Sequence, residues 1–254
     1  MKSIREIYKI GKGPSSSHTM GPERAAKLFR SEHPEADAFR VILYGSLSKT
    51  GIGHGTDRVL RETLAPLPAE IVFSEEQLPN AHPNTLDFIA LKDGCELAQL
   101  RVESIGGGDI RIPGRKDDDR EEMYVEHSFA EIADFCKWRY IHTLSDYVEL
   151  NEGPEIWDFL MEVWQVMKRS IDEGLSASGV LPGGLNVQRK AKFLYEQTPD
   201  ADIPALNEFQ QIAAFAYAVA EQNADNGTIV TAPTCGACGV VPAVLKYAQV
   251  TRGF

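Results

Sequence analysis

The spacing of apolar residues changes about halfway along the chain. In the first half, short apolar runs of strand length are bounded by turn residues, and they predict strands at 40–44, 71–73, 85–91 and 96–105. Helical spacing occurs between them, at 23–31 behind Pro22 and at 57–63. This mixed order predicts an α+β domain rather than a regular βαβ array.

From about residue 128 the apolar spacing becomes almost entirely helical. Ser128 and Glu131 form a capping box, which predicts a helix through Tyr140. Pro154 opens a longer helix, and Gly174 is expected to end it. Further helices are predicted at 186–195, at 204–222 and from 243 onward.

A turn-forming and strongly charged segment, 113–122, separates the two patterns and reads as an exposed loop. We therefore expect an α+β domain over 1–127, a helical connector over 128–152 and a mostly α-helical domain over 153–254. Few long helices remain to close the core of this last domain, so we expect it to be incomplete, as in a truncated chain.

The charge balance restricts the partners of the protein. Its 254 residues include 26 basic and 37 acidic side chains, and the net charge of −11 repels phosphate-rich surfaces. The 43% of hydrophobic residues excludes disorder for the bulk of the chain. The N-terminus lacks the apolar stretch of a signal peptide, and no segment approaches the length of a membrane span. We expect neither a nucleic acid nor a membrane as partner.

Four cysteines are too few for a disulfide scaffold, so we expect reduced thiols in the cytoplasm. Cys235 and Cys238 form a C-x-x-C pair, a spacing that suits zinc or iron binding or thiol–disulfide exchange. A tetrahedral metal site needs four ligands, and Cys95 and Cys136 stand alone. We predict no metal site in this chain, and a zinc or redox protein remains an alternative.

The densest polar cluster lies at 11–22, just before the predicted helix at 23–31. It contains three serines, His18 and Thr19. Backbone N–H groups and the helix dipole favour an anion there, such as a carboxylate or phosphate, and His18 can hold or move a proton. A serine-rich loop that only caps the helix explains the same residues, so both interpretations stay open.

A second cluster, at 44–57, is rich in glycine. His54 and Asp57 lie within one turn of each other there and can form an imidazole–carboxylate pair. The cluster is neither a P-loop nor a dinucleotide-binding fingerprint, and a surface histidine in a glycine-rich connection is the alternative. Three consecutive glycines at 106–108 follow a predicted strand and indicate close backbone approach or a plain turn.

Taken together, these segments resemble one enzyme family, the bacterial iron–sulfur L-serine dehydratases, also called L-serine ammonia-lyases. The matching blocks are Gly13–Thr19 with Gly21-Pro22, Tyr44–Leu47 with Gly51, Gly53-His54 and Thr56-Asp57, Ser104–Gly108, Gly179–Gly183, and Thr231–Thr234 with Gly236–Gly239 and Val241–Leu245. They follow the family's order and cover nearly the whole chain.

The resemblance implies a two-part enzyme that converts L-serine to pyruvate and ammonia, in amino-acid catabolism and gluconeogenesis, without pyridoxal phosphate. Residues 1–127 correspond to the beta domain, which is allosteric-substrate-binding-like, and 153–254 to the first part of a helical catalytic alpha domain. The complete enzyme would be a homodimer with a [4Fe-4S] cluster that acts as a Lewis acid on the serine hydroxyl.

The cluster-binding cysteines of the family lie in blocks that have no counterpart here. Cys238 falls at a position that is commonly cysteine but does not bind the cluster, and Cys235 falls where asparagine is more frequent. We therefore expect this chain alone to bind no cluster and to be inactive. A non-catalytic serine-binding regulatory or assembly module is the alternative function, and the preference for serine or threonine stays open.

The same resemblance and clusters give the candidate site residues. His54 is the first candidate for proton transfer, and His18 is the second. The predicted substrate-binding residues are Ser15, Ser16, Ser17, Thr19, Thr56, Asp57, Gly106, Gly107, Thr234, Cys235 and Gly236.

Overall fold

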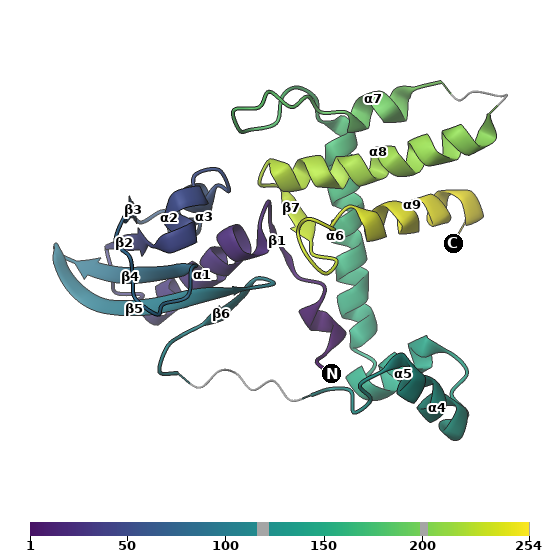
Figure 1. The fold of residues 1–254 in the computed structure, drawn as a ribbon, viewed down its shortest axis with the longest axis horizontal. Helices are drawn as coiled ribbons and strands as arrows, with labels where there is room; N and C mark the ends of the chain where they lie inside the picture. The colour runs from purple at the N-terminus through teal and green to yellow at the C-terminus, as the bar shows by residue number, and fades with distance from the viewer. Residues whose placement is uncertain (116–121, 199–202, 254) are drawn as a thin grey trace.

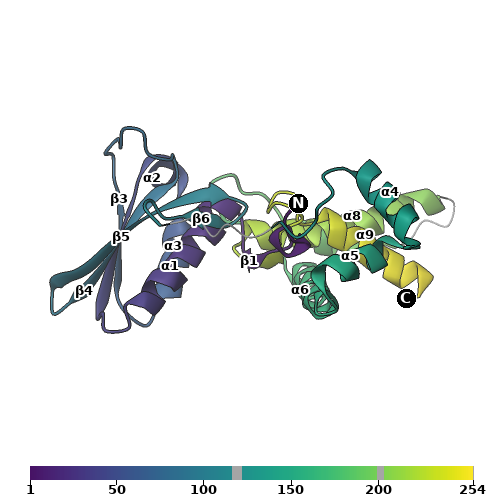
Figure 2. The ribbon, with the colours of Figure 1, turned by 90° about the horizontal axis from the view of Figure 1, so that it is seen from below.

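The computed structural model describes residues 1–115, 122–198 and 203–253. The chain forms an α/β unit and a helical unit that lie side by side (Figures 1 and 2). Within the described residues, no helix is both long and apolar enough to cross a membrane.

The α/β unit contains a five-stranded sheet in the order β3-β2-β4-β5-β6. β2 and β3 are parallel, and all other neighbours are antiparallel. Buried and half-buried residues alternate along β2, so one face of the sheet is apolar. The strands are β2 (Ala38–Leu43), β3 (Ala69–Phe73), β4 (Thr85–Lys92), β5 (Cys95–Gly106) and β6 (Asp109–Arg111).

Two helices cover the apolar face of this sheet (Figure 2). They are α1 (Gly21–Glu32) and α3 (Thr56–Leu64), while the short α2 (Gly45–Thr50) follows β2. Phe29, Leu60 and Phe88 are completely buried between helices and sheet, and each such side chain contributes about 1.5–3 kcal/mol. This core fixes the N-terminal ends of α1 and α3, where the two polar clusters lie.

The helical unit is built around α6, which packs against α8 and α9. A Cβ on Gly174 would lie 2.2 Å from the carbonyl oxygen of Ala218, so glycine allows α6 and α8 to cross closely. The predicted end of the helix at Gly174 is wrong, because α6 continues to Ser176. The helices are α4 (Phe129–Arg139), α5 (Leu144–Glu152), α6 (Ile156–Ser176), α7 (Ala191–Glu196), α8 (Pro204–Ala224) and α9 (Val240–Arg252).

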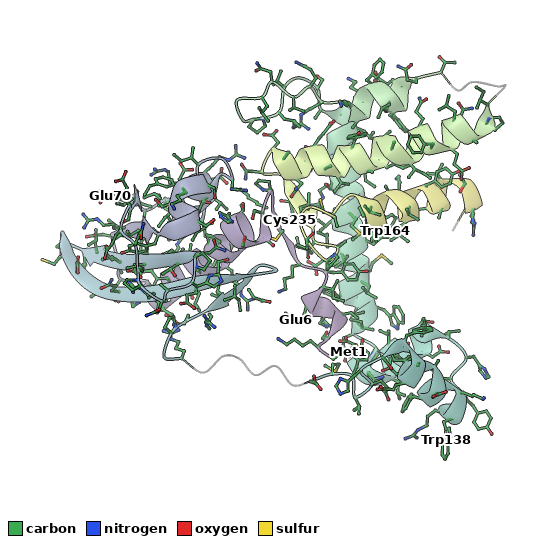
Figure 3. All side chains as sticks on the ribbon, in the orientation of Figure 1. Met1, Glu6, Glu70, Trp138, Trp164 and Cys235 are labelled. Atoms are coloured by element: carbon green, nitrogen blue, oxygen red, sulfur yellow. The ribbon has the colours of Figure 1, made fainter. Side chains whose placement is uncertain are left out.

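The N-terminal segment packs on the helical unit before the chain enters the sheet. Its strand β1 (Ile10–Lys12) pairs in antiparallel fashion with β7 (Thr228–Val230). Met1 and Glu6 lie beside one end of α6 (Figure 3). Residues Ile4–Glu6 of this segment form a 3₁₀ turn, η1. The domain boundaries predicted at 127 and 152 stay predictions.

The predicted combination of helices and strands is confirmed, but α5, β1, β6 and β7 were not predicted and one helix was misplaced. A helix was expected over 186–195, but α7 begins only at Ala191, because Val180 and Gln188 form an antiparallel bridge before it. The capping residue of α7 comes from α8: Glu221 accepts hydrogen bonds from the backbone of Lys190 (2.5 Å) and Ala191 (3.2 Å). The similarity to allosteric substrate-binding domains stays a prediction, and most of the predicted charged loop lies outside the described residues.

Candidate functional site

The polar cluster before α1 forms a π-helical turn, η2 (Ser16–Met20). The Ser15 side chain caps it by accepting a hydrogen bond from the His18 N–H at 3.1 Å. Met20 N–H donates to the Ser15 carbonyl at 3.1 Å, five residues back, which is the bond that defines a π turn. Such turns are frequent at functional sites, and this one directs His18 toward α2.

The His18 ring is held between hydroxyl groups. Its Nδ1 lies 2.9 Å from Ser17 Oγ and 3.5 Å from Ser15 Oγ, and its Nε2 lies 3.0 Å from Ser46 Oγ on α2. Partial burial lowers the pKa of His18, and the nearby imidazole of His54 lowers it further. Both causes favour the neutral ring at pH 7.

His54 lies against His18, with ring centroids 4.6 Å apart and planes tilted by 33°. Its Nδ1 is 2.9 Å from the carbonyl oxygen of Thr50. Because a carbonyl only accepts, Nδ1 of the neutral ring carries the proton, and the lone pair is on Nε2. In the described residues no hydrogen bond or ion pair joins His54 to Asp57, and the Thr50 carbonyl orients the ring instead.

Two buried threonines connect the histidine segments to each other. Thr56 Oγ1 donates to the His18 carbonyl at 2.7 Å, and Thr19 Oγ1 donates to the His54 carbonyl at 3.1 Å. Both side chains are completely buried. These reciprocal bonds fix the main chain at both histidines, so Thr19 and Thr56 lie beneath the candidate site and not on its surface.

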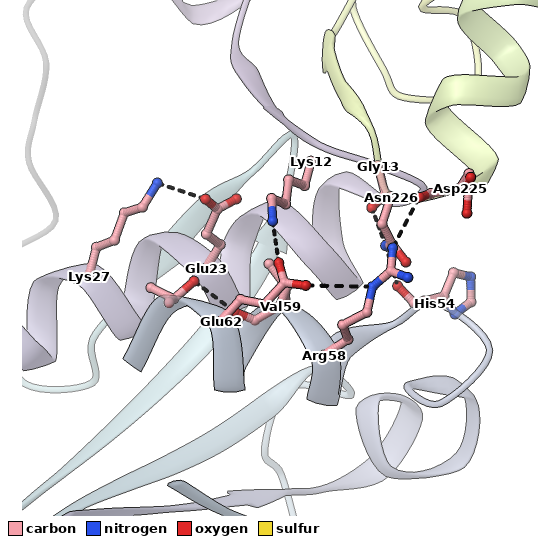
Figure 4. A network of polar contacts seen from close by, with 11 residues as sticks. Lys12, Gly13, Glu23, Lys27, His54, Arg58, Val59, Glu62, Asp225 and Asn226 are labelled. Atoms are coloured by element: carbon pink, nitrogen blue, oxygen red, sulfur yellow. Dashed lines mark hydrogen bonds and ion pairs between the residues drawn. The ribbon is translucent and has the colours of Figure 1, made fainter. Parts of the chain in front are cut away.

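The turn between α8 and β7 brings the helical unit into contact with the two histidine segments (Figure 4). Asn226 Nδ2 donates to the Gly13 carbonyl at 2.6 Å and lies 3.5 Å from the His54 carbonyl. Arg58 Nη2 donates to the carbonyl of Asp225 at 3.0 Å. The histidine pair therefore lies at the junction of the two units.

The glycines at 106–108 form the turn between β5 and β6. Gly106 and Gly107 have φ of +101° and +60°, and a Cβ on either would meet nothing within 4 Å. Turn geometry, and not close approach of another group, therefore requires glycine there. Ser104 on β5 contacts the polar cluster instead: a Cβ added to Gly21 would lie 2.1 Å from Ser104 Oγ.

The C-x-x-C segment reaches the polar cluster through one buried thiol. Cys235 Sγ lies 3.9 Å from Met20 Sδ, and Figure 3 shows Cys235 at the junction of the units. Thr234 and Gly236 are exposed on either side. Burial raises the pKa of Cys235 to about 11 and that of Cys238 to about 12, so both remain thiols at neutral pH.

These cysteines do not fit an iron–sulfur cluster. Cluster iron is bound by several thiolates converging on one point. Cys95 is exposed on β5 and Cys136 lies on α4, far along the chain from the buried pair. Among the residues that the structure describes, no group of three or more His, Cys, Asp or Glu side chains is arranged to hold a metal ion.

Two residues of the site were not found from the sequence. Ser46 lies within the glycine-rich cluster at 44–57, and its position at the start of α2 could have indicated a hydroxyl facing the site. Asn226 precedes Gly227, and Asn-Gly is a turn signal. That signal predicts the turn but not its contact with Gly13, which lies more than two hundred residues earlier.

Comparisons with known proteins identify the family of this chain. Residues 59–253 match the family model for the serine dehydratase alpha chain, and residues 3–65 match that for the beta chain. An L-serine dehydratase of Escherichia coli K12, TdcG, is 34% identical over 300 aligned positions, which cover 97% of this chain and 66% of the relative.

Other curated relatives give the same result. The L-serine dehydratase of Streptomyces coelicolor is 29% identical over 96% of this chain and 65% of its own length. That of Mycobacterium tuberculosis is 33% identical over 97% of this chain and 64% of its own length. The chain thus spans about two thirds of the length of the curated relatives it matches.

Proposed function

Because this chain belongs to the serine dehydratase family, we propose that it functions in an L-serine ammonia-lyase, which converts L-serine to pyruvate and ammonia. The chain alone, in which the family's cluster-binding cysteines have no counterpart, is expected to be inactive. The observation that carries the proposal is the histidine pair held at the junction of the two units. The alternative, a serine-binding module without activity, is not favoured, since the relatives are named as enzymes.

The reaction sets the requirements for the site. A base must remove the weakly acidic α-proton of serine, and the β-hydroxyl must leave as water after gaining a proton. The aminoacrylate that results takes up one water and releases ammonia and pyruvate. The chain therefore has to supply a proton acceptor, a binding site for the carboxylate and a source of protons.

His54 is the proposed proton acceptor. The Thr50 carbonyl holds its Nδ1–H, so the lone pair on Nε2 is available to accept a proton from the substrate. The His54 carbonyl is fixed by Thr19, which limits movement of the ring. Partial burial lowers the pKa of His18, and the neighbouring His54 ring lowers it further.

The start of η2 is the proposed carboxylate site. The backbone N–H groups of Ser16 and Ser17 open the turn, where no preceding turn supplies acceptors. The hydroxyls of Ser15 and Ser17 lie at Nδ1 of His18 and that of Ser46 lies at Nε2, and they can donate further hydrogen bonds. A negative group is favoured at this end of the turn and of α1 behind it.

The remaining parts of the proposal rest on family resemblance. They are catalysis without pyridoxal phosphate, a homodimer, a cytoplasmic location, and roles for Asp57, Gly106, Gly107 and Thr234–Gly236 at the substrate. The iron–sulfur cluster also belongs here, but the thiols of this chain do not fit it, and none of the steps above depends on it.

The test is an anaerobic incubation of the purified chain with iron and sulfide, followed by L-serine. Pyruvate and ammonia formed in equal amounts support the proposal, and L-threonine in a parallel tube reports the preference for substrate. No bound iron and no product is the result expected for the chain alone. Bound iron and bound serine without either product would contradict the proposed activity and support the binding module.

A further inference from the structure

The turn Asp225–Gly227 makes a series of contacts with the α/β unit. Asn226 Nδ2 reaches the carbonyls of Gly13 (2.6 Å) and His54 (3.5 Å). Gly13 N–H donates to the Gly227 carbonyl at 3.1 Å. Asn226 and Gly227 thus contact the main chain next to both polar clusters, and the Asp225 carbonyl accepts a hydrogen bond from the Arg58 side chain (Figure 4).

This turn is anchored firmly in the helical unit. Arg189 Nη2 donates to Asp225 Oδ2 at 2.6 Å, and only 5% of the Arg189 side chain is exposed. Gly227 N–H donates to the Gln222 carbonyl at 2.7 Å, which closes the end of α8. Asn226 itself has φ of +57°, a left-handed conformation that asparagine tolerates better than most residues.

The opposite side of the contact is equally restricted. Gly55 has φ of +64°, and a Cβ on it would lie 2.6 Å from Asn226 Oδ1. The Asn226 amide therefore fills the space above the peptide that joins His54 to Gly55. Because Thr19 binds the same His54 carbonyl from the η2 side, a shift of Asn226 would change how that peptide is held.

We propose that Asn226 is a positioning residue, through which the helical unit sets the orientation of His54 relative to His18. Its amide holds the His54 carbonyl and the entry to η2 at Gly13 in one arrangement. It need not touch the substrate. Its effect on catalysis rests on the proposed function, whereas its effect on the two rings does not.

The test uses Asn226→Gly, which keeps the left-handed backbone and removes the amide. Arg58→Gln is the matched control, since it removes another contact with the same turn, at the Asp225 carbonyl, without touching a histidine segment. Asn226→Asp is a second variant of nearly the same shape, in which a carboxylate faces the two carbonyls and cannot donate to them.

The first measurement is the ¹H–¹⁵N NMR spectrum of the histidine side chains in the full chain. We expect both Asn226 variants to displace the ring signals of His18 and His54, and Arg58→Gln to leave them in place. Unmoved ring signals in the folded Asn226 variants would overturn the proposal. Equal displacement by Arg58→Gln would overturn it as well, because general loosening of the junction would then explain the effect.

The second measurement is kcat/KM for L-serine. A misplacement of a catalytic group by about 1 Å costs up to about 100-fold in rate, so we expect a loss of about 10- to 100-fold in Asn226→Gly and less than about 3-fold in Arg58→Gln. Equal rates in wild type and Asn226→Gly would refute a catalytic effect. If the wild type binds iron and serine but forms no pyruvate, the proposed function fails, and the ring spectra still decide the positioning.

Discussion

Replacement of Thr56 by valine tests how the histidine segments are held together. Thr56 Oγ1 is buried and donates to the His18 carbonyl at 2.7 Å. Pro22, four residues after His18, has no N–H to donate to that carbonyl, so the threonine hydroxyl takes the place of a helical hydrogen bond. Valine keeps the shape of the side chain and removes only the hydroxyl.

The expected loss follows from leaving a buried acceptor without its partner. Such a change costs about 1–3 kcal/mol of unfolding free energy, and we expect about 2 kcal/mol for Thr56→Val. For a chain of this size that corresponds to a fall in Tm of about 4–8 °C. Thermal unfolding monitored by circular dichroism measures it directly.

Thr63→Val is the control for this experiment. Thr63 Oγ1 donates to the Val59 carbonyl at 2.7 Å within the same helix, α3, where that carbonyl has a helical N–H partner as well. We expect a loss below about 0.5 kcal/mol there. If Thr56→Val costs no more than Thr63→Val, the hydroxyl does not hold the His18 segment and the reasoning is refuted.

Three further predictions concern protonation, thiols and packing. Burial lowers the pKa of His18 below its usual 6.5, so the folded state resists protonation of this ring. The stability that the neutral ring contributes is fully present above pH 6.5, and it is lost as the pH falls from there through the lower pKa of the folded state. Between about pH 7.5 and about pH 5.5 the Tm should fall more in the wild type than in His18→Gln, and equal falls would contradict this. Burial raises the pKa of Cys235 to about 11, so this thiol should react with Ellman's reagent far more slowly than exposed Cys95, whereas similar rates would show that the segment opens readily. Gly174→Ala should lower the free energy of unfolding by about 2 kcal/mol or more, because the added Cβ would overlap a carbonyl of α8. Gly184→Ala is the control, since a Cβ there would meet nothing within 4 Å. Equal Tm values for the two variants would contradict the packing argument.

The local parts of this fold could be predicted from the sequence because they depend on near neighbours. Apolar spacing predicted β4 and α8, and Ser128 was correctly placed as the cap of α4, accepting a hydrogen bond from Glu131 N–H at 3.2 Å. The Glu131 carboxylate accepts its hydrogen bond from the His127 N–H rather than from the Ser128 N–H, and the spacing of the residues does not distinguish the two.

The failures concern contacts between distant segments. Gly174 has the residue type of a helix end, but its role is to let α8 approach, which only the packed structure reveals. The polar clusters at 11–22 and 44–57 were predicted separately. Nothing in either segment indicates that Thr19 donates to the His54 carbonyl and Thr56 to the His18 carbonyl. Long-range pairing of this kind depends on the whole core.

The predicted pairing of His54 with Asp57 shows the same limit at short range. The spacing allowed an imidazole–carboxylate contact, but α3 begins at Thr56 and places Asp57 in its first turn, where a carboxylate is favoured by the helix dipole. The His54 ring turns back to the Thr50 carbonyl instead. The tautomer that makes His54 a candidate base therefore comes from backbone geometry.

The most direct test of this account compares L-serine turnover by the wild type, His54→Asn and His142→Asn in the complete, cluster-containing enzyme. His142 is an exposed histidine between α4 and α5, remote from the site, and serves as the control. We expect His54→Asn to lose at least about 100-fold in kcat/KM for pyruvate formation, and the control to match the wild type. Turnover by a folded His54→Asn variant at the wild-type rate would contradict the assignment of His54 as the proton acceptor.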